Sequence, residues 1–261
     1  MHFTKKHRQN TSLAGSFLVI TFGLLVLSWG SSALLSQTLD WEVNHPLIRV
    51  LYVVGGFSPT VASYLVLRER ECVSSFRAWL KQVFDIKHSL FTYACVAIFV
   101  AVYYVIGCMV NGFELGAPVF MLLVIVPMML FGGGNEEVGW RMILQPELEK
   151  KFSFHPAVWI TAIIWWIWHL PLFFIKGTVN VSIDYFLFGI MCLSLSYALA
   201  TVRRISKGVF PCILTHCLIN GLSATFVFQL SAKSCCLTLI TVVLLSMLIL
   251  KFFPQKAEGV D

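Results

Sequence analysis

Apolar residues fall into eight long runs along this chain, and short polar segments separate them. Each run holds roughly 17 to 25 residues, and ~20 residues of α-helix cross ~30 Å of hydrocarbon. Inside the runs there is no two-residue alternation, so the pattern predicts helices. The chain is therefore predicted to be an all-α polytopic membrane protein with about eight transmembrane helices. The expected spans are 13–35, 47–67, 89–108, 118–140, 156–175, 184–202, 208–229 and 235–252.

Composition supports a membrane protein and argues against a soluble domain with a large core. Of the 261 residues 58% are hydrophobic and 12% are charged, and the mean hydropathy is +0.81, which is typical of a membrane protein. No internal repeat or large loop is evident, so residues 1–261 are expected to form a single integral membrane domain. The eight cysteines include no CxxC pair and are expected to be reduced. The net charge of +6 follows membrane topology rather than nucleic-acid binding.

The distribution of Lys and Arg predicts the orientation, since these residues accumulate on the cytoplasmic side of a membrane. If the N-terminus is inside, sixteen of the 19 basic residues fall on the cytoplasmic side. Both termini are therefore expected to be cytoplasmic. The three exceptions are Arg49, Lys176 and Lys233.

Charged residues close the fourth apolar run, in the stretch Gly134–Arg141. An ionisable group in lipid costs on the order of 3 kcal/mol unless it is paired or faces a watery cavity, so such groups indicate a functional site. On a helix Glu137 and Arg141 share a face, whereas Glu136 points about 100° away. The arginine is expected to clamp one glutamate and leave the other for chemistry. If the helix continues from Pro118 to Leu144 it is about 40 Å long.

Three further polar residues interrupt apolar runs: His169, His216 and Asn220. The last two are four residues apart and share a helix face. Because none of these side chains can face lipid cheaply, they are expected to converge with the glutamates. His169 is expected to lie somewhat too deep for a shared level unless the helix breaks or tilts around Pro171 or the fifth span starts later. The glycines at 132–134 are expected to let another helix approach closely, or alternatively to loosen the helix beside the glutamates.

This set of groups suits two kinds of hydrolytic chemistry. A glutamate beside a histidine can deprotonate a water, while a second histidine and a carboxamide can donate hydrogen bonds to the oxyanion of an attacked carbonyl. Alternatively Glu136, His169 and His216 could hold a divalent metal such as zinc, with an open position for water. The compact HExxH motif is absent, and spacing alone does not decide between the two.

Together the motifs resemble those of the CAAX protease and bacteriocin-processing family of intramembrane proteases. Its three motifs are EExxxR, FxxxH and HxxxN or HxxxD, and the resemblance covers about residues 118–229. Trp165 stands where the second motif has Phe, an exchange of one aromatic residue for another that is expected to alter little beyond the substrate groove. The positions that meet the motifs are Glu136, Glu137 and Arg141, then His169, then His216 and Asn220.

The resemblance implies a role for each motif residue. Glu136 would activate water with the help of His169, and His216 and Asn220 would form the oxyanion hole. A metal-free mechanism is favoured, with no cofactor. The remaining residues of the first motif would support the site, namely Glu137 and Arg141.

The expected function is therefore intramembrane endopeptidase activity on a membrane-associated peptide or lipidated protein, of the CAAX or the bacteriocin-leader type. The small size and minimal loops favour a bacterial plasma membrane. One alternative is a non-proteolytic immunity or scaffolding protein of the same fold. A proton-coupled transporter is a third possibility, because Glu, His and Arg within spans also build proton relays.

Overall fold

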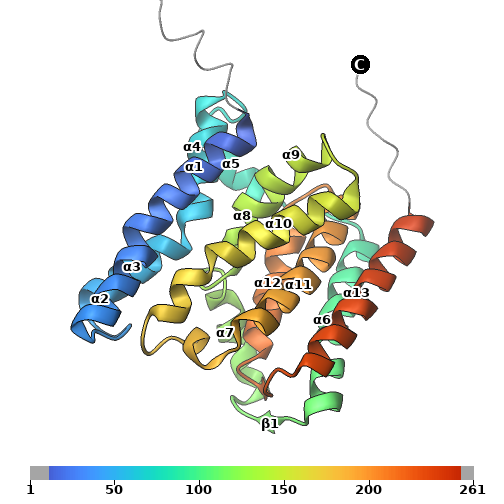
Figure 1. Ribbon diagram of the computed structural model, residues 1–261. Coiled ribbons are helices and arrows are strands. Elements are labelled where there is room, and N and C mark those ends of the chain that lie inside the picture. Colours follow the sequence, from blue (N-terminus) through green and yellow to red (C-terminus); the bar gives the residue numbers. More distant parts are fainter. Residues whose placement is uncertain (1–11, 254–261) are drawn as a thin grey trace, which may run out of the picture. The chain divides into compact units, whose positions relative to one another are not determined.

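The computed structural model describes residues 12–253, which are helical apart from short turns and one two-residue strand pair (Figure 1). The first half contains α1 Leu13–Leu25, α2 Ser31–Leu39, α3 Pro46–Gly56, α4 Ser58–Glu69, α5 Phe76–Val83, α6 Leu90–Asn111, β1 Glu114–Leu115 and α7 Leu122–Met128. The second half contains α8 Glu137–Gly139, α9 Gln145–Glu149, α10 Phe154–Trp168, α11 Tyr185–Ser206, α12 Phe210–Leu222, β2 Phe226–Val227 and α13 Ala232–Phe252. The predicted fold class, an all-α polytopic membrane protein, is confirmed.

The apolar helices differ in whether they can cross a bilayer. In the described part of the chain five are long enough: Leu13–Leu39, Leu90–Asn111, Phe154–Phe174, Tyr185–Ser206 and Ala232–Phe252. A sixth span is possible if α3 and α4, which meet at a bend of 47°, count as one. Two of the eight predicted runs contain only shorter apolar helices, Val119–Met128 and Phe210–Leu222.

The number of spans and the side of each terminus therefore stay predictions. Four of the basic residues used to orient the chain lie outside the described residues. They are Lys5, Lys6, Arg8 and Lys256.

The span predicted over residues 118–140 is not one continuous helix, and the continuation to Leu144 does not occur. Helix α7 contains Pro127 and ends at Met128, and the chain turns before it resumes as a 3-10 turn at Gly134–Glu136. After α8 a π-helical turn at Trp140–Leu144 leads into α9. Proline removes a helical hydrogen bond and glycine lowers helix stability, which explains the break between residues 128 and 134.

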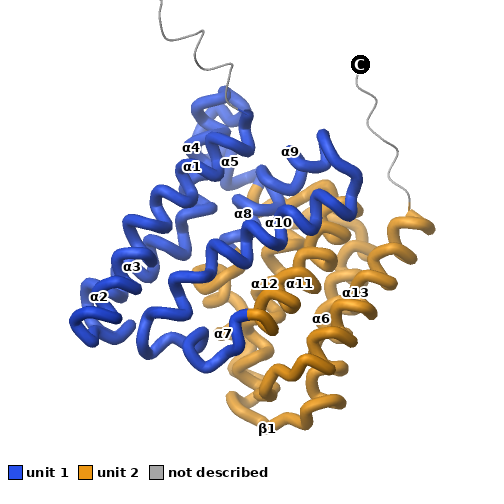
Figure 2. The backbone as a smooth tube through the Cα atoms, viewed as in Figure 1, with its two compact units in different colours: residues 1–82, 135–185 blue, residues 83–134, 186–261 orange. Residues whose placement is uncertain are grey.

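The described chain divides into two compact units (Figure 2). The first contains the chain up to Gln82 together with Asn135–Tyr185, and the second contains Val83–Gly134 together with the chain from Phe186 onward. The single domain over residues 1–261 stays a prediction. The division assigns Glu136 and His169 to the first unit and His216 to the second.

The first unit has an aromatic core built around Trp168. Helix α1 packs along α4, and the ring of Trp168 lies 4.4 Å from Trp29 and 5.7 Å from Trp140, centroid to centroid. Phe17 from α1 meets Trp140 edge to face at 5.4 Å. The Trp168 indole N–H donates to Ser58 Oγ at 3.1 Å, which satisfies a polar group inside this apolar cluster. The helix that carries His169 is thereby fixed against α4.

The second unit is a group of helices around α6. This helix packs against α12 and α13, and α12 also packs against α7 (Figure 1). Tyr104 on α6 donates a hydrogen bond to the Ile219 carbonyl of α12. The strands β1 and β2 pair antiparallel, with Glu114 opposite Val227. The eight cysteines all lie within the described residues, where none of them forms a disulfide.

Candidate active site

Hydrogen bonds from Asn135 anchor the two glutamates of the first motif. The Asn135 amide donates to the carbonyl of Gly56 and to Thr60 Oγ1, both at 3.2 Å, and Thr60 Oγ1 donates to the Asn135 carbonyl at 2.7 Å. These bonds tie the start of the helical stretch to the end of α3 and to α4. Glu136 and Glu137 follow directly and are 7% and 0% exposed, so their positions are set by packing rather than by solvent.

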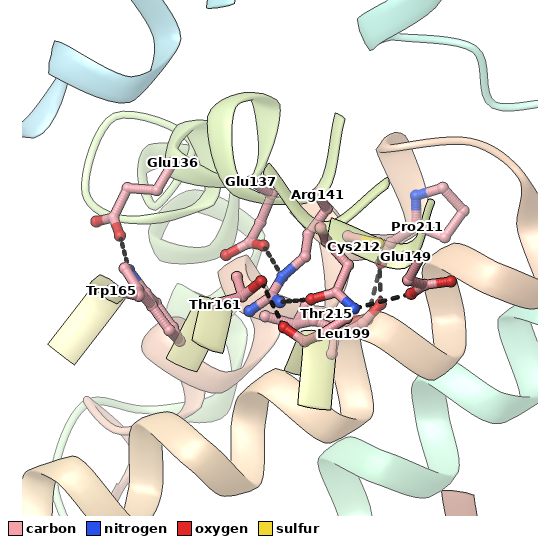
Figure 3. Close-up of polar contacts among 12 residues, drawn as sticks. Glu136, Glu137, Arg141, Glu149, Thr161, Trp165, Leu199, Pro211, Cys212 and Thr215 are labelled. Atoms are coloured by element: carbon pink, nitrogen blue, oxygen red, sulfur yellow. Dashed lines mark hydrogen bonds and ion pairs between the residues drawn. The ribbon is translucent and has the colours of Figure 1, made fainter. Parts of the chain in front are cut away.

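Glu137 is paired with the arginine of its own motif. Arg141 Nε donates to Glu137 Oε2 at 3.0 Å, and both side chains are fully buried (Figure 3). The network continues in two further steps of four residues: Arg141 Nη1 donates to Gln145 Oε1 at 3.4 Å, and Gln145 Nε2 donates to Glu149 Oε1 at 2.8 Å. The clamp predicted from the four-residue spacing is confirmed. A buried carboxylate that is paired in this way is suited to support a site rather than to accept protons from a substrate.

Glu136 faces α10 and meets its aromatic and imidazole side chains. The indole Nε1 of Trp165 donates to Glu136 Oε2 at 2.8 Å (Figure 3). The same oxygen lies 3.8 Å from His169 Nε2, and the two side chains are each 9% exposed. The structure thus brings Glu136 and His169 together, while Glu137 is held by Arg141.

The position of His169 follows from the end of α10. The helix ends at Trp168, and a 3-10 turn that contains Pro171 follows, so the break expected near Pro171 is present. His169 Nδ1 lies 2.8 Å from the Trp165 carbonyl oxygen. A carbonyl oxygen only accepts, so Nδ1 carries the hydrogen, and in the neutral ring Nε2 is an acceptor. An acceptor nitrogen therefore faces the Glu136 carboxylate.

In the second unit His216 and Asn220 meet the backbone of the glycine turn. Asn220 Nδ2 donates to the Gly132 carbonyl at 3.1 Å. Gly133 has a φ of +138°, and a Cβ there would lie 2.4 Å from Asn220 Nδ2 and 3.0 Å from His216 Nε2. Only glycine combines this backbone angle with this close approach. The residues of the third motif thus lie together at one bend of the chain, and their roles stay predictions.

Metal binding was an open alternative for Glu136, His169 and His216. Among residues 12–253 there is no group of three or more His, Cys, Asp and Glu side chains placed to hold a metal ion. Glu136 and His169 offer two potential ligand atoms, Oε2 and Nε2. The choice between a metal and a metal-free site stays a prediction.

Sequence reasoning missed Trp165 as a polar group. It was expected to act only as an aromatic replacement, yet its side chain is 2% exposed and its N–H bonds the Glu136 carboxylate. A buried indole N–H usually finds a partner, whereas a Phe ring has none to offer. The indole N–H, which Phe lacks, is therefore the feature of the sequence from which the bond between Trp165 and Glu136 could have been predicted.

A comparison with protein families finds one match, and it covers the segment that carries the three motifs. The model of the family described as type II CAAX prenyl endopeptidase Rce1-like matches residues 117–222. A search of curated proteins finds no match to the chain. The matched segment contains Glu136, Glu137, Arg141, His169, His216 and Asn220. The resemblance to the CAAX protease and bacteriocin-processing family is thereby confirmed over the segment that carries all three motifs.

Proposed function

We propose that the protein is an intramembrane endopeptidase that hydrolyses a peptide bond of a membrane-associated substrate, with Glu136 and His169 activating the water. The observation that carries this proposal is the buried pair Glu136 Oε2 and His169 Nε2, 3.8 Å apart. Both atoms are acceptors when the histidine is neutral, so they do not hydrogen-bond each other directly. They are suited to accept the two hydrogens of one water.

The hydrolytic step follows from this arrangement. A water oxygen about 2.8 Å from each acceptor would donate one hydrogen to Glu136 and one to His169. As the water oxygen attacks the carbon of the scissile carbonyl, Glu136 takes one proton from the water. The carbonyl π electrons move onto the carbonyl oxygen, which becomes the oxyanion. The C–N bond then breaks, and the protonated Glu136 returns its proton to the leaving amine. The products are a carboxylic acid and an amine, and the carboxylate is regenerated.

His216 and Asn220 are proposed to stabilise the oxyanion. One N–H of the Asn220 amide is used by the Gly132 carbonyl, and an amide has a second N–H to offer. Removing one such donor costs roughly 3 kcal/mol of transition-state stabilisation in known enzymes. Gly133, which both side chains approach, is only three residues before Glu136. One family model matches the segment that carries both motifs, which supports a role for both in one reaction.

The proposed substrate is a lipidated C-terminal peptide of the CAAX type, with a leader peptide as the other candidate, and the proposed location is a bacterial plasma membrane. The family description names a prenyl endopeptidase, which supports the first substrate class. No metal or other cofactor takes part in the proposed reaction.

Purified protein in detergent tests this proposal. Cleavage of a fluorogenic prenylated peptide and of a panel of leader peptides is measured for the wild type and for Glu136→Ala, each with and without a chelator. Loss of a general base lowers the rate roughly 10²- to 10⁴-fold, so the variant should be inactive, while chelator should leave the wild type unchanged. Glu114→Gln, a change at an exposed glutamate of β1, is the matched control and should cleave normally.

Other results of this experiment would support a different mechanism or a different function. Loss of cleavage with chelator as well as in Glu136→Ala would restore the metal mechanism. If the wild type cleaves none of these peptides, the protease proposal fails and a binding role on this fold takes its place. Uptake of ions or solutes into reconstituted liposomes would instead support a transporter.

A further inference from the structure

Trp165 makes contacts with three residues of the catalytic motifs, although the second motif has a Phe at its position. Its indole N–H donates to Glu136 Oε2 at 2.8 Å. Its backbone carbonyl accepts from His169 Nδ1 at 2.8 Å. Its ring lies 5.7 Å from the Arg141 guanidinium carbon, within the range of a cation–π contact. A Phe could supply the second and third contacts but not the first.

The acceptor of Trp165 distinguishes it from neighbouring tryptophans. Trp166 donates to the Tyr185 carbonyl at 3.0 Å, and Trp168 donates to Ser58 Oγ at 3.1 Å. Those acceptors are neutral, whereas the acceptor of Trp165 is a carboxylate. A hydrogen bond to an ionised group is shorter and roughly twice as strong as one between neutral groups. The N–H therefore acts on the charge state of Glu136 as well as on its position.

We infer that Trp165 is a positioning residue whose indole N–H holds the Glu136 carboxylate in its ionised form and directs it toward His169. This inference rests on the proposed role of Glu136 as the base. The bond engages Oε2, the oxygen that faces His169, so it fixes the carboxylate rotation that the water-activating pair requires. It also disfavours protonation of Glu136 at rest, because the N–H is a better partner for the anion.

The expected consequence of removing the N–H is a shift of the pH–rate profile. Two other titratable groups act on Glu136 from the surrounding elements: His169 from the end of α10 and Tyr52 on α3. On its own element the charged groups that follow are Glu137 and Arg141, which pair with each other. These groups stay unchanged in Trp165→Phe. Without the N–H the acidic limb of kcat/KM should move upward by about one pH unit, and kcat should fall about tenfold or more.

The activity test compares Trp165→Phe with Trp166→Phe. The control removes an indole N–H one residue away in the same helix, from a bond to a backbone carbonyl. Trp165→Phe should lower kcat with little change in KM and should shift the acidic limb, while Trp166→Phe should keep the wild-type profile. A wild-type profile in Trp165→Phe, or equal changes in both variants, would overturn the inference.

A second readout does not depend on catalysis. The thermal midpoint of each variant in detergent is measured at about pH 8 and about pH 3, where an ordinary glutamate side chain is almost fully ionised and almost fully protonated, respectively. Trp165→Phe should lower the midpoint more at the higher pH, and this pH dependence should vanish in the Glu136→Ala background. A pH-independent loss would mean that Trp165 only fills space. If Glu136→Ala retains full activity, the proposed function fails. The hydrogen bond between Trp165 and Glu136 is still supported in that case if the pH-dependent loss of the midpoint is seen and vanishes without Glu136.

Discussion

Breaking the buried pair of Glu137 and Arg141 should strongly destabilise the protein. Both side chains are 0% exposed and the Nε to Oε2 distance is 3.0 Å. In Arg141→Met the Glu137 carboxylate loses this partner, Gln145 loses a donor, and the Trp165 ring loses its cation. Removing one member of a buried ion pair costs about 3–5 kcal/mol. At about 2–4 °C per kcal/mol for a chain of this size, the thermal midpoint should fall by roughly 10 °C.

The measurement is the midpoint of thermal unfolding in detergent, followed by tryptophan fluorescence at one fixed heating rate. Lys150→Met is the matched control, because Lys150 pairs with Glu147 but is 69% exposed. Exposed pairs contribute about 0–1 kcal/mol, so this control should hardly move the midpoint. The double variant Glu137→Gln with Arg141→Met removes both charges and should recover a large part of the loss, since no unpaired ion is then left in the interior.

Two outcomes would refute this reasoning. If Arg141→Met unfolds at the same temperature as Lys150→Met, the pair contributes no more than a surface contact. If the double variant is no more stable than Arg141→Met, the loss comes from packing around the arginine and not from an uncompensated buried carboxylate.

Two further predictions concern the glycine turn and an exposed ion pair. Gly133→Ala should lower cleavage at least tenfold, because a Cβ would lie 2.4 Å from Asn220 Nδ2 and holding an L-residue at this backbone angle costs about 1–3 kcal/mol. In the control Gly132→Ala the new Cβ meets only Met129 at 3.6 Å, and equal activity of the two variants would contradict this prediction. Lys176→Ala should leave the midpoint unchanged at neutral pH: its ammonium lowers the pKa of fully exposed Asp40, and solvent screens the pair. Any stabilisation by that pair is present above the unfolded-state pKa of Asp40 and is lost as the pH falls through the lowered folded value, so a large midpoint drop at pH 7 would be inconsistent with it.

The spacing of residues in the sequence predicted one contact of the site, the pair of Glu137 and Arg141, because that contact depends on helix geometry alone. Glu137 and Arg141 are four residues apart and meet as expected, and an apolar helix lies in each of the eight predicted runs. The contact between Glu136 and His169 depends on where α10 ends, and Pro171 in the sequence indicated a possible end of that helix. The bond from Trp165 to Glu136 was missed because the aromatic class of the residue was considered and its N–H was not.

The fourth apolar run shows why hydropathy alone misjudged the helix. Its residues are apolar through Phe131, which favours a span, yet Pro127 and the glycines at 132–134 favour a break. Two roles were expected for those glycines, close packing or loosening, and the structure shows both at once. Gly133 takes a φ of +138° where helix α7 has already ended, and the same residue leaves room for Asn220 and His216. A continuous helix would keep its carbonyls in its own ladder, whereas the break frees the Gly132 carbonyl to bind Asn220. The short helix is therefore what allows Asn220 and His216 to approach the glycine turn.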